Sequence, residues 1–334
     1  MPFINIFLKT LGILLGFTTF IIIISLVSNL LDYNTQNYRT IKGEKSSKNI
    51  IAILNLNGPI LNNLDYSLIK NVVNYINPED IKKYLSELQT INPEILIIKI
   101  NSPGGTVSSS VHLEKIINDY KRENNTKIYF YTNGLLASGG YWVATTGDKI
   151  YANYGSIIGS IGVSGPSWYY YDKPTAISTG LIGQKIETKN GIQIYNQSAG
   201  SSKDLYNPFR KPTNEELQHL QRIVEDIYDD FLLKVSKSRK IEVTTLKNDI
   251  GALIFSSNQA KEKFLIDGVI DFEELINNII KKNGYNNYKL IEINVRESIF
   301  NKYLVSFLKP NYTSICNQLN TNFISLLPTF LNKC

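Results

Sequence analysis

The sequence GLLASGGYWVA, at residues 134–144, joins a predicted strand to a predicted helix, and the rest of the chain is interpreted around it. The apolar run KIYFYT at residues 127–132 predicts a buried strand before it, and the helix begins near Tyr141. Ser138 lies at the turn between them and is followed by two glycines. Glycines let a backbone or a substrate approach closely, and a helix N-terminus offers N–H donors. A serine hydroxyl that attacks a carbonyl needs such a turn, although simple packing of small residues explains the same letters.

Strands and helices alternate on both sides of this turn. Buried strands are predicted at residues 49–55, 94–100 and 148–152, and helices at residues 78–89 and 107–121. Because parallel strands are joined by helical crossovers, the alternation indicates an α/β fold with largely parallel pairing.

A longer amphipathic helix is predicted after Pro212, where Thr213 and Glu216 have the spacing of a capping box. Its apolar positions recur at helical spacing: Leu217, Leu220, Ile223, Val224, Ile227, Phe231 and Val235.

Composition excludes several classes of function. The 334 residues can bury a sizeable core, and the formal charge of +6 is spread out, with no basic stripe interleaved with aromatics. Nucleic-acid binding is therefore not expected. Cys316 and Cys334 lack metal-ligand spacing, so no metal or other cofactor is expected, and either a late disulfide or free thiols fits them.

Residues 10–31 carry no charge and are rich in Leu, Ile and Phe. A helix of this length spans about 33 Å, enough for a hydrocarbon core of about 30 Å. A cleaved signal peptide has a shorter apolar region and a small-residue cleavage site, so we predict an uncleaved membrane anchor after a short segment, residues 1–9. Residues 32–48 are polar and predict a tether. The basic residues within this tether outnumber Lys9 before the helix, so the positive-inside rule does not favour an exported C-terminal domain.

A serine hydroxyl is a weak nucleophile and needs a base. The two histidines, His112 and His219, lie on predicted helices away from any glycine-rich turn and are interpreted as surface or packing residues. Asp229 and Asp230 lie on a helix face and are interpreted as solvated charge.

A lysine remains as the base, because burial disfavours its charged form. Spacing alone does not rank Lys185, Lys189 and Lys203.

Five sequence blocks, in this order, resemble one family: KINSPGG (99–105), ASGGYWVA (137–144), DKIYANYGSIIGSIGV (148–163), SAGSSKDLYNPFR (198–210) and QAKEKFLIDGVID (259–271). The family is the signal peptide peptidase A group of membrane-anchored Ser/Lys endopeptidases, peptidase family S49. SPGG alone is a weak signal, but five blocks in order are specific. The resemblance predicts a peptidase domain at residues 49–284. Residues 285–334 form a C-terminal extension whose role the sequence leaves open.

By position, the resemblance implies that Ser138 is the nucleophile, Lys203 the general base and Ser160 the residue that orients the lysine amine. The oxyanion hole is implied to be formed by Gly104, Gly105 and Gly139. The segment between Ser160 and Lys203 is longer than we expect for a compact member of the family.

The resemblance also implies a fold like that of the Clp-protease/crotonase superfamily, with stacked β-β-α units around a parallel sheet. Proteins of this fold often assemble as rings, so the resemblance also implies a homo-oligomeric ring, in which an adjoining subunit can supply the lysine. The implied substrates are hydrophobic peptides such as signal-peptide remnants. An N-in, single-pass anchor with the catalytic domain outside the cytoplasm is implied, against the charge distribution above.

Two other classes of function compete with a peptidase. A catalytically silent, membrane-anchored ring that binds peptides or partner proteins would keep the fold but would need neither hydroxyl nor amine. The presence of Ser138, Ser160 and Lys203 argues against it. A crotonase-type acyl-CoA enzyme would share the fold, but such enzymes are usually soluble, and the predicted anchor argues against it.

Overall fold

The computed structural model describes residues 2–32, 38–62, 75–172, 176–180, 183–187, 197, 199–293 and 324–326. Lys189, Cys316 and Cys334 lie outside the described residues.

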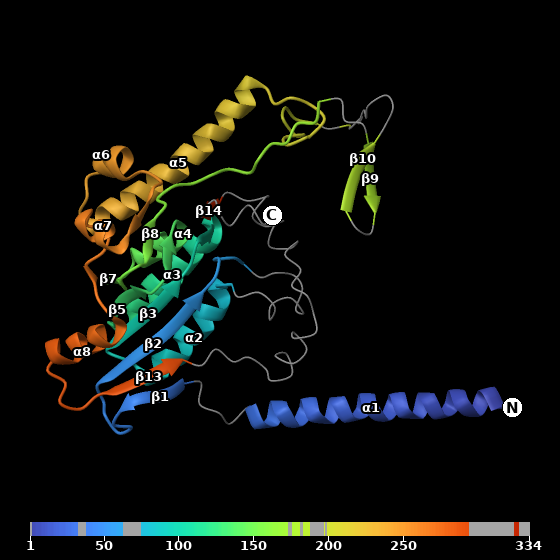
Figure 1. Cartoon of the computed structure of the whole chain (residues 1–334), viewed down its shortest axis with the longest axis horizontal. Coiled ribbons are helices and arrows are strands. Elements are labelled where there is room, and N and C mark those ends of the chain that lie inside the picture. The colour runs from blue at the N-terminus through green and yellow to red at the C-terminus, as the bar shows by residue number, and fades with distance from the viewer. Residues whose placement is uncertain are drawn as a thin grey trace.

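A seven-stranded sheet forms the centre of the molecule, in the order β1-β13-β2-β3-β5-β7-β12 (Figure 1). The strands are β1 (Tyr38–Gly43), β2 (Ile50–Asn57), β3 (Ile95–Asn101), β5 (Lys127–Thr132), β7 (Lys149–Ala152), β12 (Gly268–Val269) and β13 (Lys289–Ile293). Every neighbouring pair is parallel except β1 with β13. The predicted α/β fold with a parallel sheet is confirmed.

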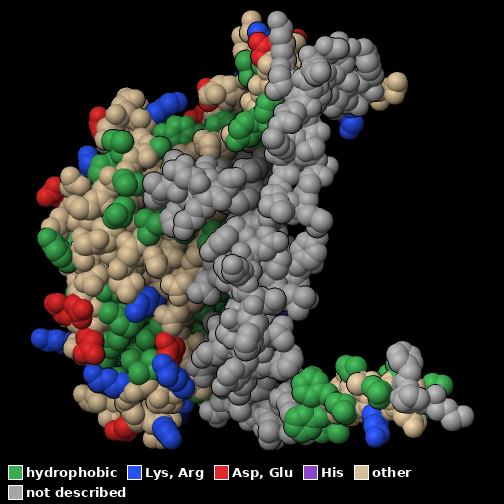
Figure 2. Space-filling view, turned by 45° about the vertical axis from the view of Figure 1, so that its right-hand side comes forward, with side chains coloured by type: hydrophobic (Ala, Val, Ile, Leu, Met, Phe, Trp, Pro, Cys, Tyr) green, Lys and Arg blue, Asp and Glu red, His purple; other side chains and the backbone are tan. Residues whose placement is uncertain are grey.

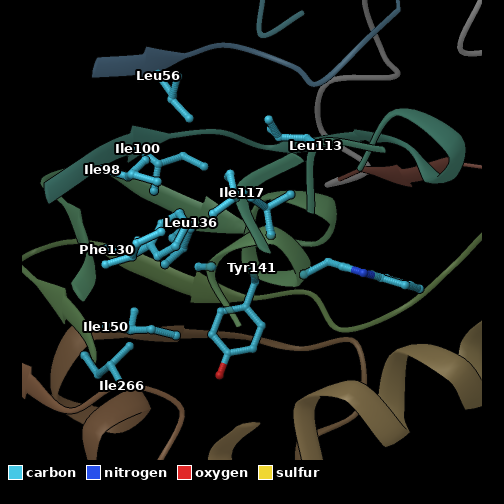
Figure 3. Close-up of a cluster of buried hydrophobic side chains, with 14 of the residues drawn as sticks. Leu56, Ile98, Ile100, Leu113, Ile117, Phe130, Leu136, Tyr141, Ile150 and Ile266 are labelled. Carbon is cyan, nitrogen blue, oxygen red and sulfur yellow. The ribbon is translucent and has the colours of Figure 1, made fainter. Parts of the chain in front are cut away.

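Both faces of this sheet are covered, which explains the nearly continuous Ile and Leu of its strands. Alternate residues of β2 and β3 face α2 (Pro78–Ile91) and α3 (Val107–Asn124) on one side. The intervening residues face α8 (Phe272–Lys282) on the other side. Figure 3 shows side chains from the sheet packed against those of α3 and against Tyr141, on the face of the sheet that α2 and α3 cover. Tyr141 is fully buried, and its hydroxyl donates a hydrogen bond of 2.7 Å to the carbonyl of Leu265.

A second, smaller sheet carries the serine turn. It has the order β11-β8-β6, formed by β6 (Leu135–Ala137), β8 (Ile157–Gly159) and β11 (Ile254–Ser256). The short helix α4 (Gly139–Ala144) follows β6. Three further short helical segments, α6 (Val243–Thr245), a π-helical turn (Leu246–Ile250) and α7 (Ser257–Glu262), flank β11 along the chain. A two-stranded ladder pairs β4 (Gly104–Thr106) with β14 (Ile324–Leu326).

The long helix α5 (Asn214–Arg239) begins at the predicted capping box, in which Thr213 and Glu216 each bond the other's backbone. Between Asn214 and Asp230 only Glu216 is buried, whereas three side chains near the C-terminal end are buried, Phe231, Leu232 and Val235. Figure 1 shows α5 rising away from the sheet, with the hairpin of β9 (Ala176–Gly180) and β10 (Gly183–Glu187) beyond its upper end.

Helix α1 (Pro2–Asp32) contains the predicted anchor at residues 10–31. Its stretch Ile4–Ile23 has a mean hydropathy of 2.2 and is long and apolar enough to cross a membrane. Figure 2 shows α1 projecting from the body of the molecule with mostly hydrophobic side chains on its surface. The helix therefore fits a transmembrane anchor.

The central sheet reaches beyond the predicted domain limits of 49 and 284. Strand β1 lies within the predicted tether, and β13 lies within the predicted extension and inserts between β1 and β2. The two strands are short, and β1 has a polar edge-strand sequence, YRTIKG, which carries no alternating apolar pattern. Their pairing depends on contacts between the two ends of the chain, which local patterns do not encode.

Candidate active site

Ser138 occupies a strained turn between β6 and α4. Its backbone has φ 55° and ψ −123°, a conformation that costs a non-glycine residue about 1–3 kcal/mol. The surrounding structure holds it there, because its N–H donates to the carbonyl of Gly159 at 2.8 Å and its carbonyl accepts the Trp142 N–H at 2.9 Å. The side chain is buried at 1% exposure. The sharp strand-to-helix turn predicted from the glycines is confirmed.

Ser160 lies beside Ser138. Strands β6 and β8 are parallel, with Ala137 opposite Gly159, so the two serines follow paired residues at the carboxyl ends of adjacent strands. Ser160 also has a positive φ, 53°, and its N–H donates to the carbonyl of Leu253 at 2.7 Å. The structure thus brings together two buried serine residues that are distant in sequence.

The loop between β3 and β4 lies against the same turn. Ser102 accepts a bond from the Ala137 N–H at 3.1 Å and donates its own N–H to the Leu135 carbonyl at 2.7 Å. The approach is so close that a Cβ on Gly140 would lie 3.0 Å from the Ser102 Cβ. A larger residue at Gly140, immediately after the predicted oxyanion residue Gly139, would therefore push Ser102 out of its position.

Gly104 and Gly105 follow this loop as the first residues of β4 and pack against Ile60. The Ile60 N–H donates to the Gly104 carbonyl at 2.8 Å, and the Thr106 N–H donates to the Ile60 carbonyl at 3.1 Å. A Cβ on Gly105 would lie 1.9 Å from the Ile60 oxygen, so no other residue fits there. Because backbone groups alternate along a strand, the Gly105 N–H and carbonyl face away from Ile60.

Lys203 lies on a separate, exposed turn, where its N–H donates to the Gly200 carbonyl at 3.3 Å. Arg210 fastens this turn to the start of α5, because its guanidinium bonds both carboxylate oxygens of Asp204 at 2.7 Å and both of Glu216 at 2.7 and 2.8 Å. These bonds and the Thr213 N–H lower the pKa of Glu216 to about 2.

Aromatic side chains also contact this turn and help to hold it in place. The Arg210 guanidinium lies 5.1 Å from the ring centroid of Trp168, and the Trp168 indole N–H donates to the Asn207 carbonyl at 3.1 Å. The Trp168 and Tyr206 rings lie 5.3 Å apart. The turn that carries Lys203 is therefore an ordered part of the arm formed with the N-terminal end of α5.

Helix α5 separates this arm from the serine turn. Phe231, near the C-terminal end of the helix, packs on Trp142 of α4 with ring centroids 4.6 Å apart. The stretch from Thr213 to Phe231 spans about 27 Å at the rise of an α-helix. One chain therefore brings together Ser138, Ser160 and the glycine loop, by which we mean residues 102–105. It leaves Lys203 beyond the N-terminal end of α5.

The other basic and acidic candidates remain outside the site. His112 is paired with Glu79 at 3.4 Å on the surface, and His219, Asp229 and Asp230 are exposed. Lys185 lies in β10 of the hairpin beyond α5. No role was assigned to Arg210 from the sequence. Its position in the NPFR block, just before the capping box, is the sequence feature that indicates a contact with Glu216.

Comparison with known proteins identifies the family. Residues 120–286 match the model of peptidase family S49. The chain belongs to peptidase family S49. A protein named as a protease from Methanocaldococcus jannaschii is 30% identical over 203 residues, which cover 61% of this chain and 60% of the relative. A protein named as a signal peptide peptidase from Enterococcus faecium is 28% identical over 258 residues, covering 76% and 69% respectively.

A solved structure of a membrane-bound stomatin-specific protease with a substrate peptide is similar to this S49 chain at 16% identity. The similarity covers 78% of this chain and 98% of that one, with a TM-score of 0.45.

Proposed function

We propose that this S49 chain is a membrane-anchored serine endopeptidase in which Ser138 is the nucleophile and Lys203 the general base. The observation that carries the proposal is the strained, buried turn of Ser138, held beside Ser160 and the glycine loop in a chain of this family. Strained backbone at a buried nucleophile is a common property of catalytic sites, where the fold must hold the reactive group in one orientation.

The proposed reaction is acyl transfer to the serine. The neutral Lys203 amine removes the hydroxyl proton as the Ser138 oxygen bonds to the substrate carbonyl carbon. Backbone N–H groups of Gly104, Gly105 and Gly139 would stabilise the oxyanion, and Ser160 would orient the lysine amine. The lysine returns the proton to the leaving amine, and water then hydrolyses the acyl-enzyme ester.

We propose that Lys203 reaches Ser138 from a neighbouring copy of the chain in a homo-oligomeric ring. Two observations support this. Lys203 is exposed on the turn at the N-terminal end of α5, and about 27 Å of helix separates Thr213 at that end from Phe231, which packs on α4 after the serine turn. The apolar stripe on the outer half of α5 is also not buried, and Leu217 is 46% exposed. A second copy packed on this stripe would bury it and bring a lysine to the serine.

The proposed substrates are hydrophobic peptides close to a membrane, such as signal-peptide remnants. Helix α1 would hold the peptidase domain at the membrane, and the relative from Enterococcus faecium is named as a signal peptide peptidase. In this proposal the anchor is N-in and the catalytic domain lies outside the cytoplasm.

Mixing two inactive variants tests the proposal. The detergent-solubilised protein and a fluorogenic peptide with hydrophobic residues before the cut are used, and Ser138→Ala and Lys203→Ala should each lose at least about 10³-fold in kcat/KM. Co-assembled in equal amounts, they should recover about a quarter of wild-type activity, because a serine and the neighbour's lysine then meet at random. Lys211→Ala, an exposed lysine over the Tyr170 ring, is the matched control and should remain active.

Other outcomes separate the alternatives. If both variants are inactive and their mixture stays inactive although it co-assembles, a lysine supplied by the neighbour is wrong. If only Ser138→Ala is inactive, another base, with Lys185 or Lys189 the first to test, replaces Lys203. A wild type that binds peptides but cleaves none of them would favour the silent ring scaffold over the peptidase.

A further inference from the structure

A buried carboxylate lies among three helices next to the serine turn. Glu114 of α3 is 7% exposed, and its Oε2 accepts the indole N–H of Trp142 in α4 at 2.8 Å. Its Oε1 pairs with the amine of Lys234 in α5 and accepts the side-chain amide N–H of Asn118 at 3.3 Å. Figure 1 shows α4 lying between α3 and α5, so the carboxylate contacts side chains of both other helices.

Trp142 connects this carboxylate to the turn of the proposed nucleophile. Its backbone N–H donates to the Ser138 carbonyl at 2.9 Å, while its indole N–H donates to Glu114. Its ring also packs on Phe231, and the Lys234 amine lies 5.8 Å from the centroid of the Trp142 ring. Trp142 is therefore bonded to the strained turn through its backbone and to a buried charge through its side chain.

Helix α4 needs such contacts to keep its orientation. It has six residues, and a helix this short is not stable by itself. The φ of 55° at Ser138 also persists only because the surrounding contacts maintain it. A buried ion pair adds little net stability compared with apolar side chains of similar size, so the bonds of Glu114 are better explained by the orientation that they give to Trp142.

We propose that Glu114 is a positioning residue for the nucleophile: its carboxylate orients the Trp142 indole, and the Trp142 backbone holds the turn of Ser138 in its reactive conformation. Glu114 acts through Trp142 and not on the reacting atoms. Lys234 supplies the charge that lets the carboxylate stay buried. The inference rests on the proposed peptidase function for its effect on kcat, whereas the effect on the turn is measured without catalysis.

Two double variants isolate the bond to the indole. Glu114→Gln with Lys234→Met keeps an oxygen that accepts the indole N–H and leaves no unpaired charge. Glu114→Leu with Lys234→Met also leaves no unpaired charge, but it removes the acceptor. Both proteins should fold, because exchanging a buried ion pair for neutral side chains of similar size costs little stability, and urea denaturation checks this.

Amide hydrogen exchange measures the turn directly, since the Trp142 N–H donates to the Ser138 carbonyl. In a fragment that contains Trp142, exchange should be at least about tenfold faster in the variant without the acceptor than in the variant with it. Trp142→Phe provides a second test if the variant without the acceptor does not fold. It removes the indole N–H, keeps a ring against Phe231 and should show the same faster exchange.

Kinetics provide a measurement that a purely structural role would not change. Without the acceptor, kcat should fall about 100-fold while KM stays within about twofold, because a misplaced nucleophile slows the chemical step and not substrate binding. With the acceptor, kcat should stay within about threefold of the wild type. Adding Trp142→Phe to the variant without the acceptor should lower kcat little further, because both changes remove the same bond.

The outcomes distinguish this inference from the function beneath it. Equal exchange in the two double variants overturns the role of Glu114, whatever the activity. Faster exchange without the acceptor, at equal kcat in an active enzyme, shows that the turn loosens without affecting the reaction, and also overturns it. Faster exchange without the acceptor, when even the wild type hydrolyses no peptide, supports the ordering of the turn by Glu114 and contradicts the peptidase.

Discussion

The two halves of the proposed site are built in opposite ways. The serine half is buried: Ser138 and Ser160 are 1% and 5% exposed, and both have positive φ angles maintained by parallel strands. The lysine half is an exposed arm, ordered by one guanidinium between two carboxylates and by stacked aromatic rings. Strain can be held in the first because the packed core overdetermines the backbone. The second is a local structure on the surface, held by polar and aromatic contacts.

The two halves also lie at opposite ends of α5. A single chain holds Ser138 in a buried turn, whereas the turn that carries Lys203 lies at the N-terminal end of α5, from which about 27 Å of helix leads to Phe231. Helix α5 connects the two halves, and the contact of Phe231 with Trp142 fixes its angle to the core.

The largest expected effect comes from removing the contact between Phe231 and Trp142. Phe231→Ala removes a fully buried ring from the contact with Trp142 and should lower the free energy of unfolding by about 3–5 kcal/mol. Leu233→Ala, which is 58% exposed two residues along the same helix, should change it by less than about 0.5 kcal/mol. Urea denaturation measures both. Equal losses in the two variants would contradict the idea that α5 is held by this face.

A substitution in the arm is expected to lower activity rather than the stability of the core. Arg210→Ala leaves Asp204 and Glu216 without their shared partner, so the Lys203 turn loosens and kcat/KM should fall about 100-fold. The melting temperature of the core should change little, because these contacts lie outside it. Arg210→Lys should not restore activity, since an ammonium does not match the forked pairing with two carboxylates. Arg222→Ala, an exposed arginine on α5, serves as the control.

The pH dependence of hydrolysis sharpens the assignment of the base. Only a neutral amine accepts a proton, so kcat/KM should rise with pH into the alkaline range, by about tenfold per unit while the lysine is mainly charged. Initial rates from pH 6 to 9, with assembly checked at each pH, measure this. A flat profile would count against a lysine base.

The smallest expected effect is in the core. Asp267 accepts bonds from the Lys149 amine, the Ile150 N–H and the Arg239 guanidinium at 2.7–2.8 Å. Burial alone would raise the pKa of Asp267, but these bonds hold it below its usual range. Its stabilisation is therefore present above about pH 4 and is lost as the pH falls through the lowered pKa.

Asp267→Asn should consequently cost about 1–2 kcal/mol at neutral pH and less in acid. Thermal melts of the two proteins at pH 7 and at about pH 3 measure the difference. A gap in melting temperature that is as large at the lower pH would show that the charge of Asp267 does not stabilise the fold.

Much of the fold was predictable because its signals are local. The strand at residues 127–132 has the predicted bounds, and the helix caps at Asn77, Thr106 and Thr213 are formed by residues that normally fulfil this role. The paired strands β1 and β13 were not predicted, because each is short and their pairing joins the two ends of the chain.

The sequence by itself determined the alternation of strands and helices, the apolar N-terminal helix and a serine at a glycine-rich turn, because each depends on neighbouring residues. Only the tertiary structure decided that Ser160 lies beside Ser138, that Arg210 orders the lysine turn, and that the C-terminal end pairs with Gly105. It also decided that Lys203 lies far from the serine in one chain. Such distances depend on strand register and on the direction of a long helix, which arise from contacts between residues distant in sequence.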